Sequence, residues 1–112
     1  MKISTQGALV KPKEKHQPLF KLFEYGNLEV EIYTPAKVDR QKPHNIDEVY
    51  IVISGRGDVH NNGDTQPFIA GDFLFIPAGK EHRFLNFTDD FATWDFSFDQ
   101  MDDRRKLLIK MK

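Results

Sequence analysis

The feature that most constrains the fold is a series of short apolar segments separated by turn-forming residues. From residue 20 onward these segments are rich in Val, Ile, Phe and Tyr, which favour β-strands. Leu28, Val30 and Ile32 alternate with Glu29 and Glu31, the pattern of a strand with one polar face. We predict strands at residues 20–25, 28–33, 44–53, 58–60, 65–69, 72–76, 81–86 and 91–98. So many short strands, with a turn about every 8–12 residues, predict an all-β sandwich or barrel.

The turns and the two ends of the chain complete the predicted organisation. Gly26-Asn27 and Asn62-Gly63 are pairs that favour tight two-residue turns between antiparallel strands. Residues 1–18 are polar and Lys-rich, so we expect an irregular N-terminal segment there, with at most a short edge strand at 8–10. Residues 99–112 begin with acidic residues and end with lysines, which favours a short C-terminal helix. The barrel itself is predicted over residues 19–98.

Composition excludes several classes of protein. The chain has 112 residues, the length of a single domain, with 16 Lys and Arg against 17 Asp and Glu. This near-neutral charge gives no electrostatic case for a nucleic-acid partner. The absence of Cys rules out disulfides and thiolate metal sites. Since no apolar stretch resembles a signal peptide or reaches the ~20 residues of a membrane helix, we expect a cytoplasmic protein without membrane association.

The residues that carry chemistry lie between positions 42 and 86. His44 and Glu48 are four apart on a predicted strand, so they project from the same face. His82 and Phe84 share one face of a later strand. If the two strands are neighbours in one sheet, two imidazoles and one carboxylate converge inside the barrel. This ligand set suits non-haem iron and also accepts zinc, manganese, cobalt or nickel.

Two motifs strengthen that interpretation. Residues 71–86 read Gly, five residues, Pro, one residue, Gly, two residues, His, three residues, Asn. Residues 44–55 read His, three residues, Glu, six residues, Gly. This pattern resembles the two motifs of the small single-domain cupins, the family of the cupin 2 conserved barrel, over about residues 28–98. The resemblance implies a jelly-roll β-barrel (a double-stranded β-helix) with His44, Glu48 and His82 as metal ligands. It also implies a homodimer that pairs through barrel edges.

The first motif departs from the family pattern at one position. Cupins with four protein ligands have a further histidine where this chain has Lys42, and an ammonium group there would repel a cation. Three outcomes remain open. The metal is held by three residues with Gln41 or water filling the gap, or Lys42 turns outward at Pro43, or the barrel holds an organic ligand without metal. Tyr50 and Phe84 are expected to line the same pocket.

The sequence therefore supports two hypotheses about function. One is a metal-dependent enzyme, of oxygenase or isomerase type, acting on a small polar substrate. The other is a non-catalytic cupin that binds a small molecule, with a structural metal or none. The sequence supplies no unambiguous acid or base beside the site, because Glu48 is assigned to the metal, so enzyme status stays open. Phe73 and Phe75, two apart on one strand, are expected to lie in the core between sheets.

Overall fold

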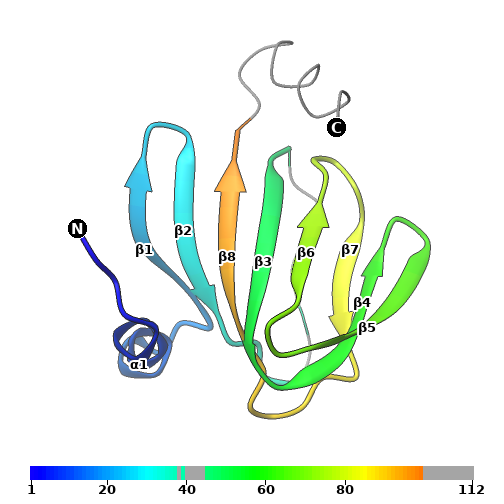
Figure 1. The fold of residues 1–112 in the computed structure, drawn as a ribbon, viewed down its shortest axis with the longest axis horizontal. Helices are drawn as coiled ribbons and strands as arrows, with labels where there is room; N and C mark the ends of the chain where they lie inside the picture. The colour runs from blue at the N-terminus through cyan, green and yellow to red at the C-terminus, as the bar shows by residue number, and fades with distance from the viewer. Residues whose placement is uncertain (38, 40–44, 100–112) are drawn as a thin grey trace.

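The computed structural model describes residues 1–37, 39 and 45–99. These residues form one helix and eight strands, and the strands confirm the all-β prediction (Figure 1). The elements are α1 (Thr5–Lys15), β1 (Leu19–Tyr25), β2 (Leu28–Tyr33), β3 (Asp47–Ser54), β4 (Arg56–Asn61), β5 (Asp64–Ile69), β6 (Phe73–Ile76), β7 (His82–Leu85) and β8 (Ala92–Phe98).

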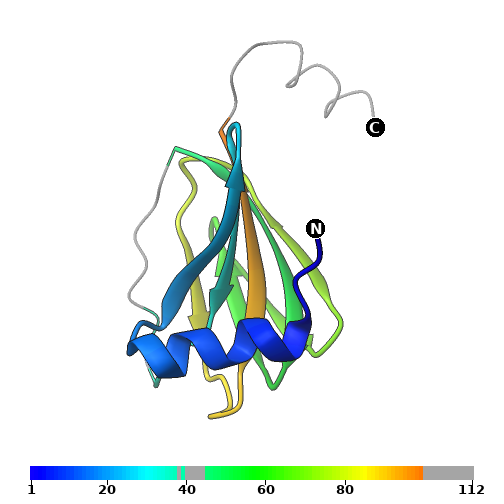
Figure 2. The ribbon, with the colours of Figure 1, turned by 90° about the vertical axis from the view of Figure 1, so that its left-hand side faces the viewer.

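The strands form two antiparallel sheets that face each other, as expected for a jelly-roll barrel. The larger sheet has the order β1-β2-β8-β3-β6, and the smaller has the order β5-β4-β7. Figure 1 shows β1, β2, β8, β3 and β6 side by side with the strands of the smaller sheet to their right, and Figures 1 and 2 show α1 at the lower end of the molecule, where it contacts β1 and β2. Strands distant in sequence are therefore neighbours, since β8 lies between β2 and β3.

Aromatic side chains fill the space between the sheets. Phe84 on β7 lies at the centre, with ring centroids 5.0 Å from Tyr50, 5.6 Å from Phe68 and 4.9 Å from Phe91. All four residues are at most 2% exposed. Burying each such side chain contributes on the order of 2 kcal/mol. The cluster thus joins both sheets around one core, and it positions the inward-facing polar side chains of β3 and β7.

Both predicted two-residue turns are present. Gly26 and Asn27 separate β1 from β2, while Asn62 and Gly63 separate β4 from β5. Asn62 and Gly63 have φ angles of 51° and 86°, as a type I′ turn requires. These turns fix the register of the two hairpins, and therefore which side chains of each strand point inward.

The prediction of an irregular N-terminal segment was wrong, because residues 5–15 form helix α1. The Ser4 hydroxyl accepts a hydrogen bond from the backbone N–H of Gly7 and caps the helix, which ends at His16 in the left-handed conformation. Only Ala8 and Pro12 of the helix are buried, so its apolar face is too narrow to give a periodic sequence signal. No helix among the described residues is long and apolar enough to cross a membrane. The predicted C-terminal helix lies outside the described residues beyond Asp99.

Strand β8 of the larger sheet has its polar residues inside and its large apolar residues outside. On β8, Thr93, Asp95 and Ser97 are buried in the interior, whereas the alternating Trp94 and Phe96 face outward and are half-buried. The prediction that Phe73 and Phe75 lie in the core was therefore wrong. Their side chains are 64% and 42% exposed, because β6 turns both aromatic rings outward.

Candidate metal-binding site

Four of the predicted pocket residues meet in the barrel interior. Glu48 and Tyr50 lie two apart on β3, and His82 and Phe84 lie two apart on β7. Each is at most 3% exposed. β3 and β7 are not neighbours in one sheet, which was the condition for the convergence predicted from the sequence. β3 belongs to the larger sheet and β7 to the smaller, so the side chains approach each other across the interior.

The polar atoms of this group form a close triangle. The Tyr50 hydroxyl donates a hydrogen bond to Glu48 Oε2 over 3.0 Å and lies 3.4 Å from His82 Nε2. Glu48 Oε1 lies 3.5 Å from the same nitrogen. Metal–ligand bonds of ~2.1 Å place two donors of a tetrahedral ion about 3.4 Å apart. The carboxylate and imidazole are therefore separated as two ligands of one ion would be, and the donor types fit a divalent transition metal.

Asp95 is a site residue that sequence reasoning missed. It faces inward from β8, opposite Tyr50 in the strand register, and its side chain hydrogen-bonds Glu48. Burial, together with the negative charge of Glu48, raises the pKa of Asp95 to about 10. Asp95 therefore keeps its proton at neutral pH in the metal-free protein, and its carboxyl O–H donates a hydrogen bond to the Glu48 carboxylate. The signal was the polar–aromatic alternation of residues 93–98, which favours one polar face.

The interior beside Glu48 has unused hydrogen-bonding capacity. Asp95 Oδ1 and Ser97 Oγ are both buried, and neither has a hydrogen-bond partner among the described residues. Ser97 is opposite Glu48 in the strand register and also lines a cavity of about 440 Å³ near the β1–β2 turn. Buried polar atoms are normally satisfied, so two unsatisfied ones beside a carboxylate fit a site for water, a cation or a small polar ligand.

The remaining predicted ligands lie outside the described residues: His44, Gln41 and Lys42. β3 begins at Asp47, and Asn45 and Ile46 form a bend, so the strand-alternation argument does not extend to His44. Among the described residues, no three His, Asp or Glu side chains form a group that could hold a metal. Of the three predicted ligands, only Glu48 and His82 thus lie among the described residues.

Two buried aspartates, one before and one after residues 40–44, anchor the chain to the barrel. Asp39, which is 2% exposed, accepts a 2.6 Å hydrogen bond from the Tyr33 hydroxyl and a 2.8 Å bond from the Phe84 backbone N–H. Asp47 accepts a 2.8 Å bond from the Ala78 backbone N–H. Asp39 therefore attaches the chain to β7 next to His82, and Asp47 attaches it to the loop before β7. Sequence reasoning assigned no role to either residue.

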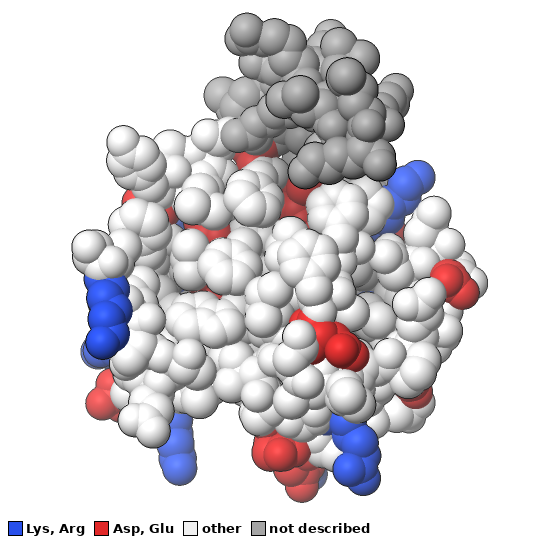
Figure 3. Space-filling model, viewed as in Figure 1, with Lys and Arg blue, Asp and Glu red and all other residues white. Residues whose placement is uncertain are grey.

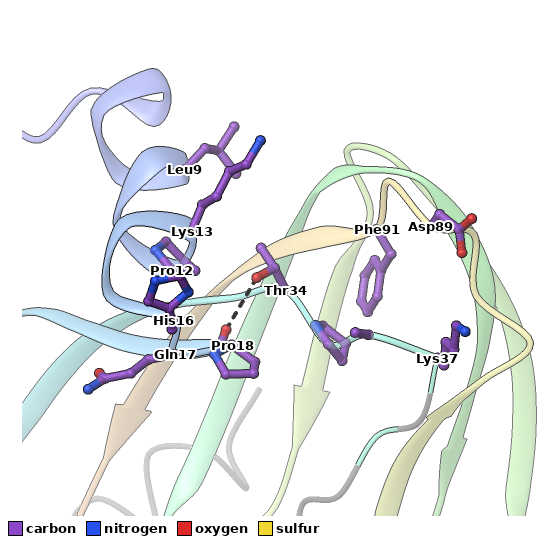
Figure 4. A pocket seen from close by; sticks show the side chains of 12 residues that line it. Leu9, Pro12, Lys13, His16, Gln17, Pro18, Thr34, Lys37, Asp89 and Phe91 are labelled. Carbon is purple, nitrogen blue, oxygen red and sulfur yellow. Dashed lines mark hydrogen bonds between the residues drawn. The ribbon is translucent and has the colours of Figure 1, made fainter.

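A larger cavity lies at the opposite end of the barrel, between α1 and the loops after β2 and before β8 (Figure 4). It has a volume of about 720 Å³ and contains none of the predicted ligands. Lys13, His16 and Lys37 surround an apolar floor that includes Phe91. Its lysines are exposed, so this cavity is a surface groove distinct from the buried polar group around Glu48.

Comparisons with known proteins agree with this architecture. The sequence model of a family described as Cupin domain matches residues 29–97. An uncharacterized protein of Streptomyces coelicolor is 36% identical over 66 residues, which cover 57% of this chain and 63% of that protein. The chain thus spans less than two thirds of the length of that relative.

Two solved structures are similar in both fold and sequence. A cupin 2 conserved barrel domain protein from Salinispora arenicola has 25% identity and a TM-score of 0.61, covering 80% of this chain and 82% of that chain. A Ralstonia eutropha protein, proposed to be a mannose-6-phosphate isomerase, has 27% identity and a TM-score of 0.56. That match covers 73% of this chain and 83% of the other.

Proposed function

Because the chain belongs to the cupin domain family, we propose that its barrel binds a divalent metal ion through His44, Glu48 and His82. The observation that carries the proposal is the 3.5 Å separation of Glu48 Oε1 and His82 Nε2 inside the barrel. An imidazole and a carboxylate that converge from opposite sheets, both buried, are more consistent with a shared ion than with a surface ion pair.

The proposed activity is a metal-dependent reaction of isomerase or oxygenase type on a small polar substrate. The bound metal would polarise a substrate oxygen or activate water or dioxygen. Tyr50 orients the Glu48 carboxylate through its hydroxyl, and Phe84 packs edge-on against the Tyr50 ring. Asp95 supplies a proton-carrying group beside Glu48, which the sequence analysis did not identify. The similarity to the Ralstonia eutropha protein supports the isomerase alternative.

The first experiment measures bound metal. Protein purified without a His tag or nickel resin is analysed by plasma mass spectrometry, as wild type and as His44→Ala and His82→Ala. We expect close to one ion per chain in the wild type and loss of it in both variants. His16→Asn is the matched control, because His16 is exposed and asparagine tolerates its left-handed backbone. Full metal occupancy in His82→Ala would contradict the proposed site.

The second candidate is a non-catalytic cupin that binds a small molecule. It is favoured by Lys42 at the position of the missing histidine, and by the cavity of about 440 Å³ beside the unsatisfied Ser97 hydroxyl. If wild-type protein stays metal-free after reconstitution with iron, zinc, manganese, cobalt and nickel, this candidate replaces the first. A thermal-shift screen of small polar compounds against the metal-free protein would then be the direct route to its ligand.

A further inference from the structure

The cavity of about 720 Å³ at the α1 end of the barrel, which we call the α1 groove, combines apolar walls with a charged rim (Figure 4). Its buried lining residues Pro12, Pro35 and Phe91 and its half-buried Leu9 are all apolar. Small-molecule sites are typically pockets of roughly 300–1,000 Å³ that are lined mainly by apolar side chains, with a few polar groups that orient the ligand. The α1 groove therefore has the size and the composition of a ligand site.

The rim of the α1 groove carries more positive than negative charge. Lys13 on α1 lies on one side, and Lys37 and Asp89 lie on the other, all of them exposed (Figure 4). In Figure 3, basic side chains gather at the margins of the molecule, including the lower end at which α1 lies. Among the described residues, none of the three rim side chains has an ion-pair partner. Two lysines against one aspartate leave one net positive charge, which favours a ligand with a single anionic group.

Two residues that line the α1 groove have a left-handed backbone. The φ angle is 54° at His16 and 66° at Lys37, and only four non-glycine residues in the described part of the chain have a positive φ. This conformation is unfavourable for most residues with a Cβ, and glycine or asparagine is usual at the end of a helix. Residues held in such conformations are common at ligand sites. The chain thus keeps an imidazole and an ammonium group at the rim where smaller residues would fit the backbone better.

The end of helix α1 could repel an anion through free carbonyl oxygens, but two of those nearest the groove are already bonded. The Pro12 carbonyl accepts a 3.0 Å hydrogen bond from the Gln17 backbone N–H, and the Lys13 carbonyl accepts one of 3.4 Å from the His16 backbone N–H. Basic side chains in the last turn also oppose the negative end of the helix dipole. The helix end is therefore compatible with an anionic group beside Lys13.

We propose that the α1 groove binds a small aromatic molecule with one anionic group, such as an aromatic carboxylate. The aromatic part lies against Pro12, Pro35 and Phe91, whose flat rings match the surface of a planar ligand. The anionic group pairs with Lys13, because Asp89 lies on the opposite side of the groove and would repel it. This site is at the other end of the barrel from the proposed metal site, so ligand binding does not require a metal ion.

The test is isothermal titration calorimetry of the full chain with 2-naphthoate. The protein is first freed of metal by dialysis against a chelator and then against plain buffer, so that the carboxylate cannot coordinate an ion. Two further probes separate the parts of the ligand: 2-naphthalenemethanol keeps the rings without the charge, and inorganic phosphate keeps a negative charge without the rings. We expect 2-naphthoate to bind at least about threefold more tightly than either, and to weaken as salt is added.

Substitutions at the rim should change the affinity in opposite directions. Lys13→Gln is expected to raise the dissociation constant of 2-naphthoate about two- to fivefold, the usual effect of one exposed charge pair. Asp89→Asn is expected to lower it by about twofold, because it removes the repelling carboxylate. Lys11→Gln is the matched control, since Lys11 is two residues from Lys13, faces another side of α1 and does not line the groove. Circular dichroism verifies that the variants are folded.

Amide chemical shifts locate the bound ligand. We expect 2-naphthoate to shift the signals of Thr34 and Phe91, which line the α1 groove. Shifts confined to Phe73 and Phe75, the exposed aromatic residues of β6, would overturn the proposal, as would the absence of heat and of shifts at millimolar 2-naphthoate. Equal affinities for 2-naphthoate and either of the other probes would also overturn it, because the rings or the charge alone would then be sufficient. An affinity that Lys13→Gln leaves unchanged would contradict the assigned pairing.

Discussion

Glu48 Oε1 and His82 Nε2 lie 3.5 Å apart although the two residues belong to different sheets. A ligand shared by both side chains would therefore join β3 to β7 across the barrel. Binding of such a ligand to the folded state alone stabilises the protein by mass action. Occupancy of the proposed metal site would thus be linked to the stability of the barrel, so metal binding could be measured by unfolding without knowledge of the substrate.

Removal of the Tyr50 hydroxyl should weaken metal binding more than it weakens the fold. Tyr50→Phe keeps the ring that packs on Phe84 but loses the hydrogen bond that orients Glu48. Loss of such an orienting partner typically costs about 10–100-fold in metal affinity, whereas one hydrogen bond contributes about 1 kcal/mol to stability. Competition with a chromophoric chelator measures the affinity. Tyr25→Phe, at an exposed position, is the control, and equal affinities for both variants would argue against this role of Tyr50.

The two hydrogen bonds of Asp39 should be a major contribution to stability. Asp39→Ala leaves the Tyr33 hydroxyl and the Phe84 backbone N–H without this acceptor in a buried setting. Because the lost bonds involve a charged acceptor, we expect a decrease of about 3 kcal/mol in the free energy of unfolding. Urea denaturation measures it, with Asp89→Ala, an exposed position, as the control. A loss below about 1 kcal/mol would show that the chain at Asp39 is only weakly attached to β7.

Asp95 should make the metal-free protein less stable as pH rises. Its folded-state pKa of about 10 exceeds the ordinary value of 3.8, so between these values the folded state binds more protons than the unfolded state. The stabilising contribution is complete below about pH 4 and is lost progressively as pH rises towards 10, with a limiting slope of about 1.4 kcal/mol per pH unit.

The measurement is urea denaturation in the presence of a chelator, between about pH 5 and pH 9, for wild type and Asp95→Asn. The variant keeps a hydrogen-bond donor to Glu48 but has no carboxyl group to titrate. Its stability should decline less with pH, so that it becomes the more stable protein at the alkaline end. Asp90→Asn, at an exposed turn, should follow the wild type. Parallel curves for wild type and Asp95→Asn would mean that Asp95 is not protonated in the folded state.

The sequence predicted much of this fold because its signals are local. Every described strand lies within two or three residues of a predicted one, since alternation and turn pairs such as Asn62-Gly63 act over a few residues. It also placed Glu48, Tyr50, His82 and Phe84 in one pocket, because motif spacing identifies positions that share a face. Whether His44 joins them, and whether a metal binds there, stays a prediction.

The predictions that were wrong, or that missed a residue, concerned which face of each strand in the larger sheet points to the interior. Aromatic residues such as Phe73 and Phe75 were assigned to the core by their chemistry, yet the larger sheet also carries large apolar side chains on its outer face. The same inversion hid Asp95, because a carboxyl group on a strand is expected to face water. Strand alternation separates two faces but does not say which is inside. That assignment depends on the opposing sheet, whose position is a long-range property of the chain.

Glycine substitutions separate backbone strain from close packing in the motif turns. Gly55 has a φ of +82°, and a Cβ there would come within 2.7 Å of the Phe91 Cα and the Thr88 Oγ1. Gly79 has a similar φ of +75°, but a Cβ would meet no atom within 4 Å. A left-handed backbone costs a non-glycine residue about 1–2 kcal/mol, and a clash with backbone atoms adds about 1–3 kcal/mol. Gly55→Ala should therefore lose about 3 kcal/mol or more in urea denaturation, and Gly79→Ala only about 1 kcal/mol. Equal losses would mean that the turn at Gly55 shifts to admit the methyl group, and that the φ angle alone requires glycine at both positions.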